Sequence, residues 1–189
     1  EEFVYKYLSL GFKEIGEEWV LEYLDTNYAA IAEQCLEDQQ KDAFEKRMAG
    51  YNAMAEGSKA PNIDLTTNNS SASSIGIEGI NNLYDIKATR TLVVFWASWC
   101  PHCQQEMPKV EDWAKKHTKT KVLAISLDDD PKAFTEAIKA YPSLMHYSDF
   151  KRWEGKAVGD YFIYGTPTFI LLDPAKDIIG KYSAFSEVE

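Results

Sequence analysis

The sequence predicts an α/β fold that is preceded by an α-helical extension. A continuous apolar run at residues 92–97 is typical of a strand that is covered on both faces. A helical stretch at 103–116 and a second apolar strand at 122–127 follow it. A strand–helix–strand unit predicts two parallel strands joined by a right-handed crossover. Residues 1–57 have a different, acidic texture, so the chain has two parts.

The N-terminal region is predicted to be helical and to form a separate domain. Apolar residues recur every three or four positions across 14–56, which predicts two or more amphipathic helices. Residues 1–57 carry 5 basic and 13 acidic side chains. Gly57 and Pro61 end the helical pattern, because glycine favours a helix C-cap and proline cannot continue a helix. We therefore divide the chain into an acidic helical region, 1–57, and an α/β domain, 58–189.

Further elements complete the predicted α/β domain. Asp130 and Pro131 predict the start of another helix, because aspartate caps helix N-termini and proline fits the first helical position. The polar tract 66–73 predicts a loop, since its Asn and Ser side chains favour turns. Short extended pieces are predicted at 63–65 and 74–77, and two further strands are predicted at 168–172 and 178–182.

Charge and hydropathy exclude some classes of partner. The 189 residues include 20 basic and 30 acidic side chains, and the net charge is −10. This charge repels nucleic acid and anionic membrane surfaces, so no nucleic-acid partner is predicted. No apolar run approaches the roughly 20 residues that a membrane-spanning helix requires.

A Cys-x-x-Cys pair lies where the predicted strand 92–97 meets the following helix. Disulfide exchange needs one ionised thiol and a second thiol that resolves the mixed disulfide. Cys100 falls at the helix N-terminus, whose unpaired N–H groups and dipole stabilise a thiolate, so it is the predicted nucleophile. Cys103 lies one turn further and is the predicted resolving thiol. His102 adds a donor or a positive charge beside the nucleophile, which favours a low pKa for Cys100.

The same spacing also suits half of a zinc site. Zinc takes four ligands, and the sequence has no second Cys-x-x-Cys or His-x-His cluster. His117 and His146 lack neighbouring ligands in sequence, so no metal or cofactor is predicted. Cys35 lies on the apolar side of a predicted helix, and we expect it to pack in a core.

The residues around the cysteine pair resemble those of a known family. Residues 95–103 read Phe-Trp-Ala-Ser-Trp-Cys-Pro-His-Cys, and Glu106-Met107-Pro108 follow. They resemble the thioredoxin superfamily, and specifically the TlpA/ResA-like thiol–disulfide oxidoreductases, which are related to the AhpC/TSA proteins. The resemblance covers roughly 59–182 and implies a thioredoxin-like fold, a central mixed sheet flanked by helices. Further matching segments are Ala60-Pro61, Ser126-Leu127-Asp128 and Gly165-Thr166-Pro167-Thr168.

The resemblance also implies a substrate-binding surface. Pro167 would be a cis-proline facing the cysteine pair, and the backbone of Thr166 would hydrogen-bond an extended substrate segment as an added strand. An ordinary trans-proline at a strand start is the alternative. Trp99, Pro101 and His102 border the nucleophile and are further candidate contact residues, although Trp99 would equally pack over the helix end.

Two positions concern the proton of the resolving thiol. Thioredoxin itself carries a buried aspartate six residues before its first cysteine, where this chain has Val94. The TlpA/ResA-like group has a glutamate three residues after the second cysteine, and Glu106 matches it. The resemblance therefore assigns to Glu106 the tuning and deprotonation of Cys103. The alternative is a solvated or ion-paired helix carboxylate. Pro108 predicts a kink in the same helix, because it lacks an N–H.

The resemblance predicts an enzyme that exchanges disulfides with extracytoplasmic protein substrates and receives electrons from an upstream redox partner. This group typically works in the periplasm or on the outer face of a membrane, so one expectation is an anchor in a removed segment before Glu1. The family favours a reductase, whereas the Pro-His dipeptide resembles that of the oxidant DsbA. Two alternatives are a binding or assembly module that uses 1–57, and a peroxiredoxin-type peroxidase, whose Pro-x-x-x-Thr-x-x-Cys pattern the sequence lacks.

Thioredoxin-like domains usually close with a helix, but only Ser183–Glu189 follow the last predicted strand. We expect either a missing element or a covering element, with the N-terminal helices as candidates. An uncovered apolar face would predict self-association, and the oligomeric state stays open.

Overall fold

The computed structural model describes residues 42, 45–46, 49–50, 52–66, 77 and 79–188. The chain divides into two compact units, Glu1–Ala53 and Met54–Glu189. The described residues between 42 and 53 are helical. The rest of the predicted helical region, including Cys35, lies outside the described residues, and so does most of the predicted 66–73 loop and of the predicted extended piece 74–77. The domain boundary at Gly57 stays a prediction.

The predicted strand–helix–strand unit is present at the centre of the second unit. Strand β1 (Arg90–Trp96) leads to helix α4 (Pro101–Lys116), and strand β2 (Thr120–Ser126) pairs parallel with β1. All residues of β1 after Arg90 are buried, as expected for a strand covered on both faces. Helix α4 continues through Pro108. The leading strand, the helix and the second strand of the prediction are confirmed.

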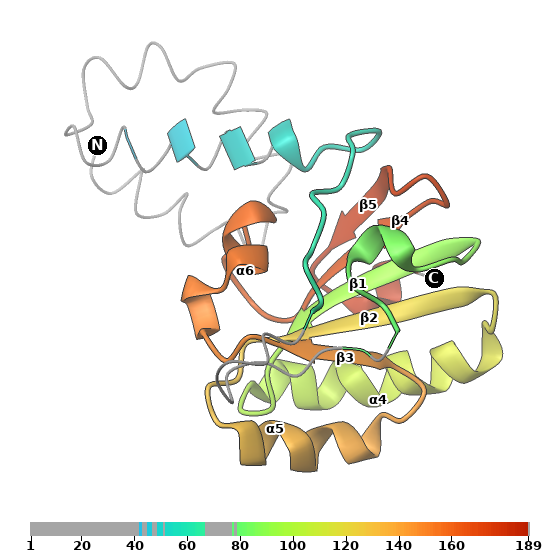
Figure 1. Ribbon diagram of the computed structural model, residues 1–189, viewed down its shortest axis with the longest axis vertical. Coiled ribbons are helices and arrows are strands. Elements are labelled where there is room, and N and C mark those ends of the chain that lie inside the picture. The colour runs from blue at the N-terminus through green and yellow to red at the C-terminus, as the bar shows by residue number, and fades with distance from the viewer. Residues whose placement is uncertain are drawn as a thin grey trace. The chain divides into compact units, whose positions relative to one another are not determined.

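Three more strands complete a mixed sheet with the order β3-β2-β1-β4-β5. Strand β3 (Met145–Ser148) is parallel to β2, whereas β4 (Thr168–Leu172) is antiparallel to β1 and β5 (Ile178–Tyr182) is antiparallel to β4. Strands β4 and β5 have the predicted bounds. The mixed sheet flanked by helices confirms the thioredoxin-like fold (Figure 1).

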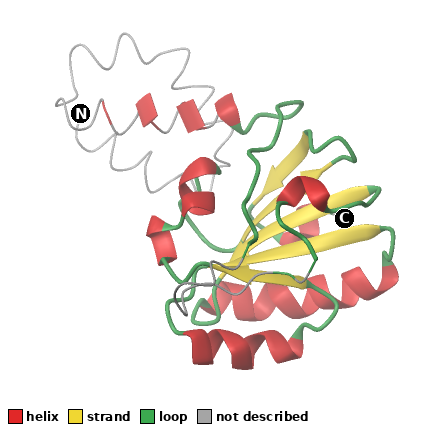
Figure 2. Cartoon of the chain, in the orientation of Figure 1, coloured by secondary structure: helices red, strands yellow, loops and turns green. Residues whose placement is uncertain are grey.

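Helices α4 and α5 (Pro131–Ala137) lie on one side of the sheet (Figure 2). Asp130 caps α5 through a hydrogen bond from the N–H of Lys132, and Pro131 occupies its first turn, as predicted. The shorter helical segments are η1 (Leu83–Asp85), η2 (Ile138–Ala140), η3 (Arg152–Glu154), α6 (Lys156–Asp160) and η4 (Phe185–Glu187).

The short extended piece predicted at 63–65 is not one of the strands of the sheet. This segment forms only an isolated bridge between Asp64 and Asn82. Its apolar residues are nevertheless buried, because Ile63 and Leu65 belong to the main hydrophobic core. The segment therefore contributes apolar side chains to the core, but it has no neighbouring strand with which to form a ladder.

The residues after β5 pack on the sheet face that carries α4. Phe185 is buried, and its ring lies 5.9 Å from the ring of Trp113 on α4 and 5.7 Å from that of Phe169 on β4. Segment η4 thus covers apolar surface on the face for which we expected either a missing element or a covering element.

We expect Phe185→Ala to lower the free energy of unfolding by about 3 kcal/mol, because it removes a buried aromatic side chain and leaves a cavity. Urea unfolding of the variant and of the wild type measures the difference. Ser186→Ala is the control, because Ser186 is exposed and its substitution should change the free energy by less than about 0.5 kcal/mol. Equal stability of the Phe185 variant and the wild type would contradict the packing described for η4.

Candidate functional site

Cys100 and Cys103 lie at the start of α4, beyond the carboxyl end of β1. Cys100 is the N-cap residue of the helix, with extended backbone angles (φ −83°, ψ 116°). Its Sγ accepts a hydrogen bond from the backbone N–H of Cys103 at 3.3 Å. The N–H of Cys103 has no partner within the helix, so it is free to stabilise a negative charge on Cys100 Sγ.

The two thiols have opposite pKa shifts. Burial disfavours the Cys100 thiolate, but hydrogen bonds from the Cys103 thiol, the Thr166 side chain and the N–H groups of Cys103 and His102 outweigh it, so the pKa of Cys100 is lowered. Burial and the hydrogen bond to Cys100 raise the pKa of Cys103 to about 12. Both cysteines are free thiols in this structure. Both thiols are buried, and their opposite pKa shifts make Cys100 the one that ionises at lower pH.

The predicted cis peptide bond joins Thr166 and Pro167, immediately before β4. The carbonyl oxygen of Thr166 lies 3.3 Å from Cys100 Sγ and accepts a hydrogen bond from the thiol. The structure therefore confirms the cis bond and brings this loop against the first cysteine, although the two segments are 66 positions apart in sequence.

The residues that border Cys100 are exposed. Trp99 has 44% of its surface accessible, and the Arg152 guanidinium lies over its ring, 5.6 Å from the ring centre. Pro101 occupies the first turn of α4, and both it and His102 are exposed. These three residues stay predicted substrate contacts.

Glu106 lies one turn after Cys103 on α4, and both of its carboxylate oxygens have partners. Oε1 pairs with Lys109 Nζ at 2.5 Å, and Oε2 accepts a hydrogen bond from the N–H of Phe185 at 3.2 Å. The Lys109 hydrogen bond and, to a smaller extent, the Phe185 N–H lower the pKa of Glu106 against the opposing effect of burial. None of the hydrogen bonds described for these residues joins Glu106 to Cys103, so the role assigned to Glu106 stays a prediction.

The two histidines weighed as metal ligands have other partners. His117 stacks on Trp113 with 4.4 Å between the ring centres, and His146 Nε2 lies 2.7 Å from the carbonyl oxygen of Tyr141. Across the described residues, no three His, Cys, Asp or Glu side chains are grouped as metal ligands would be. In the same part of the chain, no helix has the length and apolarity needed to cross a membrane.

Sequence reasoning did not assign roles to Asp128 and Arg152, which contact the segment before Cys100, or to Asp129, which contacts Arg152. Asp128, which follows β2, accepts hydrogen bonds from Ser98. Asp129 pairs with Arg152, which in turn lies over Trp99. The available signal was the position of Asp128 and Asp129, because the carboxyl ends of the parallel strands β1 and β2 lie at the same edge of the sheet.

Comparisons with known proteins agree with this geometry. A family model described as thioredoxin-like matches residues 89–178. The domain of a possible thiol–disulfide isomerase from Cytophaga hutchinsonii superposes with a TM-score of 0.57, is 30% identical, and is aligned over 71% of this chain and 88% of that structure. The chain belongs to the thioredoxin-like family.

Curated proteins that are similar to this thioredoxin-like chain include a thioredoxin-like protein and thiol-disulfide oxidoreductases. The thioredoxin-like protein YneN of Bacillus subtilis is 30% identical over 120 residues, which are 62% of this chain and 65% of YneN. The thiol-disulfide oxidoreductase ResA of Bacillus cereus is 28% identical over 128 residues, which are 66% of this chain and 68% of ResA. The chain thus spans about two thirds of the length of these relatives. The residues that the thioredoxin-like family model matches, 89–178, lie within the Met54–Glu189 unit.

Proposed function

We propose that this thioredoxin-like protein reduces disulfide bonds of extracytoplasmic proteins through Cys100 and Cys103. The observation that carries the proposal is the contact of Cys100, a helix N-cap thiol with a lowered pKa, with both the buried Cys103 and the cis-proline loop. The names of the ResA relatives support the reaction class. The extracytoplasmic location is a further proposal, drawn from the TlpA/ResA-like resemblance.

The proposed reaction has two exchange steps. The Cys100 thiolate attacks one sulfur of the substrate disulfide, so an S–S bond to Cys100 forms while the substrate bond breaks and its other sulfur leaves as a thiol. Cys103 then loses its proton and attacks Cys100 Sγ, which releases the second substrate thiol. The substrate gains two electrons and the cysteine pair loses them. A dithiol partner protein must return two electrons for each turnover.

Substrate binding is proposed to use the loop opposite the helix. An extended substrate segment beside Thr166 and Pro167 would add to the site as a strand, which holds its disulfide next to Cys100. Trp99 offers an exposed aromatic face on the other side of the nucleophile. Pro101 and His102 complete the proposed contact surface on the first turn of α4.

The equilibrium of the Cys100–Cys103 pair with glutathione tests the direction of electron flow. We expect a midpoint near or below about −250 mV, typical of a reductase, and alkylation of the free thiols at defined glutathione ratios measures it. A midpoint between about −120 and −180 mV would instead indicate an oxidant or isomerase. A pair that forms no disulfide at any ratio would contradict the whole proposal.

The proposed role of Glu106 in deprotonating Cys103 predicts that Glu106→Gln slows decay of the mixed disulfide about tenfold. This is less than a typical general base contributes, because a lowered pKa makes Glu106 a weaker base. Rapid-quench trapping of the mixed disulfide measures the rate. Lys109→Gln is the control, because it removes the ion pair and leaves the carboxylate. An unchanged decay rate with reduced stability would make Glu106 a tether for η4 only.

A further inference from the structure

A buried carboxylate at the end of β2 holds the backbone that leads to Cys100. Asp128 is 1% exposed. Its Oδ1 accepts a hydrogen bond from Ser98 Oγ at 2.6 Å, and its Oδ2 accepts bonds from the Ser98 N–H at 3.1 Å and from Ser126 Oγ at 2.5 Å. These hydrogen bonds fix the orientation of the buried carboxylate, because both of its oxygens accept from donors that are themselves held in place.

Ser98 is also fixed from its other side. Its carbonyl oxygen accepts a hydrogen bond from Gln104 Nε2 of α4 at 2.8 Å. The N–H of Cys100 donates to the carbonyl oxygen of Ala97 at 3.2 Å, which closes the turn between β1 and α4. The conformation of this turn therefore depends on Asp128 at one point and on α4 at another. The same turn sets where Cys100 Sγ lies relative to the Cys103 N–H.

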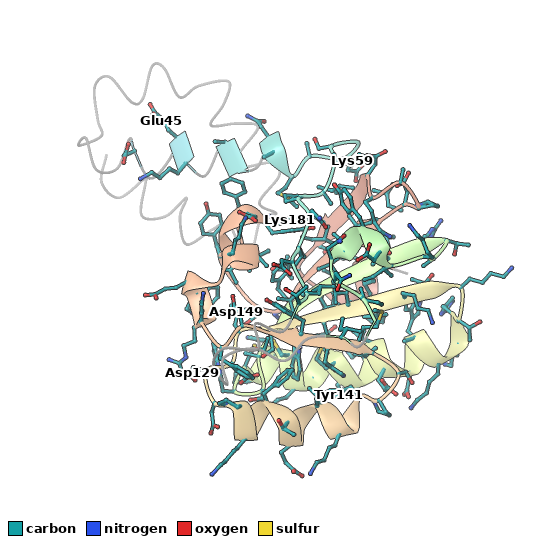
Figure 3. The ribbon with its side chains drawn as sticks, in the orientation of Figure 1. Glu45, Lys59, Asp129, Tyr141, Asp149 and Lys181 are labelled. Carbon is teal, nitrogen blue, oxygen red and sulfur yellow. The ribbon has the colours of Figure 1, made fainter. Side chains whose placement is uncertain are left out.

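The next residue along the chain, Asp129, is linked through Arg152 to the side chain of Trp99. Its Oδ2 lies 2.9 Å from Arg152 Nε, and Arg152 covers the ring of Trp99. Asp129 and Asp149 lie at the carboxyl ends of β2 and β3 (Figure 3). Two consecutive acids therefore act on the two residues before the nucleophile: Asp128 bonds to Ser98 itself, whereas Asp129 pairs with the Arg152 that covers Trp99.

We propose that Asp128 is a positioning residue for Cys100: through Ser98 it holds the turn in which the thiolate accepts the hydrogen bond of the Cys103 N–H. This inference rests on the proposed thiol–disulfide exchange, since it concerns the nucleophile of that reaction. The hydrogen bonds described for Asp128 go to Ser98 and Ser126 and not to either sulfur atom, so its effect passes through the backbone of 98–100.

Positioning and simple charge effects predict opposite signs. A negative charge near Cys100 disfavours its thiolate, so removing that charge alone would make Cys100 more reactive. Loosening the turn instead weakens the hydrogen bond that stabilises the thiolate and makes Cys100 less reactive. The sign of the change in Asp128→Asn therefore separates the two effects.

The test measures the rate of Cys100 alkylation by iodoacetamide from pH 5 to 9 in the full chain. We expect Asp128→Asn to lower the rate at pH 7 about tenfold, which corresponds to loss of one hydrogen bond to a charged group. Ser98→Ala, which retains the carboxylate, is expected to lower it about threefold, and Ser98→Thr, which retains the hydroxyl, is expected to restore it. The double variant Asp128→Asn/Ser98→Ala should react no more slowly than Asp128→Asn, because each change alone already breaks the same contact between Asp128 and Ser98.

Ser148→Ala is the matched control. Ser148 is a buried serine that pairs with Ser126 in the register of β2 and β3, and its hydroxyl bonds to the Ser126 carbonyl oxygen rather than to Asp128. Its loss should reduce the melting temperature without changing the alkylation rate. A wild-type or faster rate in both Asp128→Asn and Ser98→Ala would overturn the positioning role. If Asp128→Asn does not fold, the alkylation rates of Ser98→Ala and Ser98→Thr are compared instead. Equal rates in these two variants would overturn the positioning role.

Insulin reduction by the wild type is measured in parallel, so that the two proposals fail separately. A wild type that does not reduce insulin, with the expected alkylation pattern, would count against the proposed function alone. An active wild type whose Asp128 and Ser98 variants alkylate at the same rate would count against the positioning role alone.

Discussion

Cys100→Ser is expected to lower the rate of insulin disulfide reduction to the uncatalysed background, a loss of at least about 10³-fold. A serine hydroxyl stays protonated at neutral pH and cannot form the mixed disulfide. The helix N-cap position that stabilises a Cys100 thiolate therefore has no anion to stabilise. The turbidity of reduced insulin, followed with dithiothreitol as electron donor, measures this rate.

Cys103→Ser should lose turnover by a different route. Cys100 still attacks the substrate, but no second thiol releases the product, so the mixed disulfide accumulates to one equivalent of protein. Non-reducing electrophoresis detects it. Cys35→Ser is the control, because Cys35 is predicted to pack in a core, and its insulin-reduction rate should equal that of the wild type. Turnover in the Cys100 variant would remove Cys100 from the proposed mechanism, whereas loss of turnover in a folded Cys35 variant would contradict the purely structural role predicted for Cys35.

The sequence predicted the centre of the fold well because its strands are buried on both faces. Continuous apolar runs identify β1, β2 and β4 without any knowledge of their neighbours. Strand β3 was missed, since its four residues, Met145–Ser148, mix polar and apolar side chains and gain their strand conformation by pairing with β2. In the predicted extended piece 63–65, Ile63 and Leu65 are buried, but the segment forms a single bridge and no ladder.

The chemical centre of the site was predictable from local spacing, and its supporting contacts were not. Cys100 and Cys103 are one helical turn apart, so their relation follows from α4 alone. Asp128 contacts Ser98 from 30 positions away, through an arrangement that exists only when β1 and β2 lie side by side. Arg152, whose guanidinium lies over Trp99, has a positive φ (52°) at the start of η3, and no periodicity of the sequence predicts that geometry.

The opposite pKa shifts of the two thiols predict selective alkylation at neutral pH. With its pKa raised to about 12, Cys103 is ionised to about 1 part in 10⁵ at pH 7, whereas an unperturbed thiol is ionised to a few per cent. The lowered pKa of Cys100 increases its share further. A more basic thiolate is intrinsically a better nucleophile, which returns part of this difference. We therefore expect Cys100 to react with iodoacetamide at least about 100-fold faster than Cys103.

Mass spectrometry of peptides from protein alkylated at pH 7, made in a Cys35→Ser background, counts the modified sites. One modified residue, Cys100, is expected in the native state, and both cysteines are expected to react in guanidinium, which removes the burial that raises the pKa of Cys103. The Cys100 rate should rise with pH to a plateau below the ordinary thiol pKa, because a lowered pKa completes ionisation at lower pH. Equal rates at the two native cysteines would contradict the division into nucleophile and resolving thiol, since that division requires Cys103 to stay protonated until Cys100 is engaged.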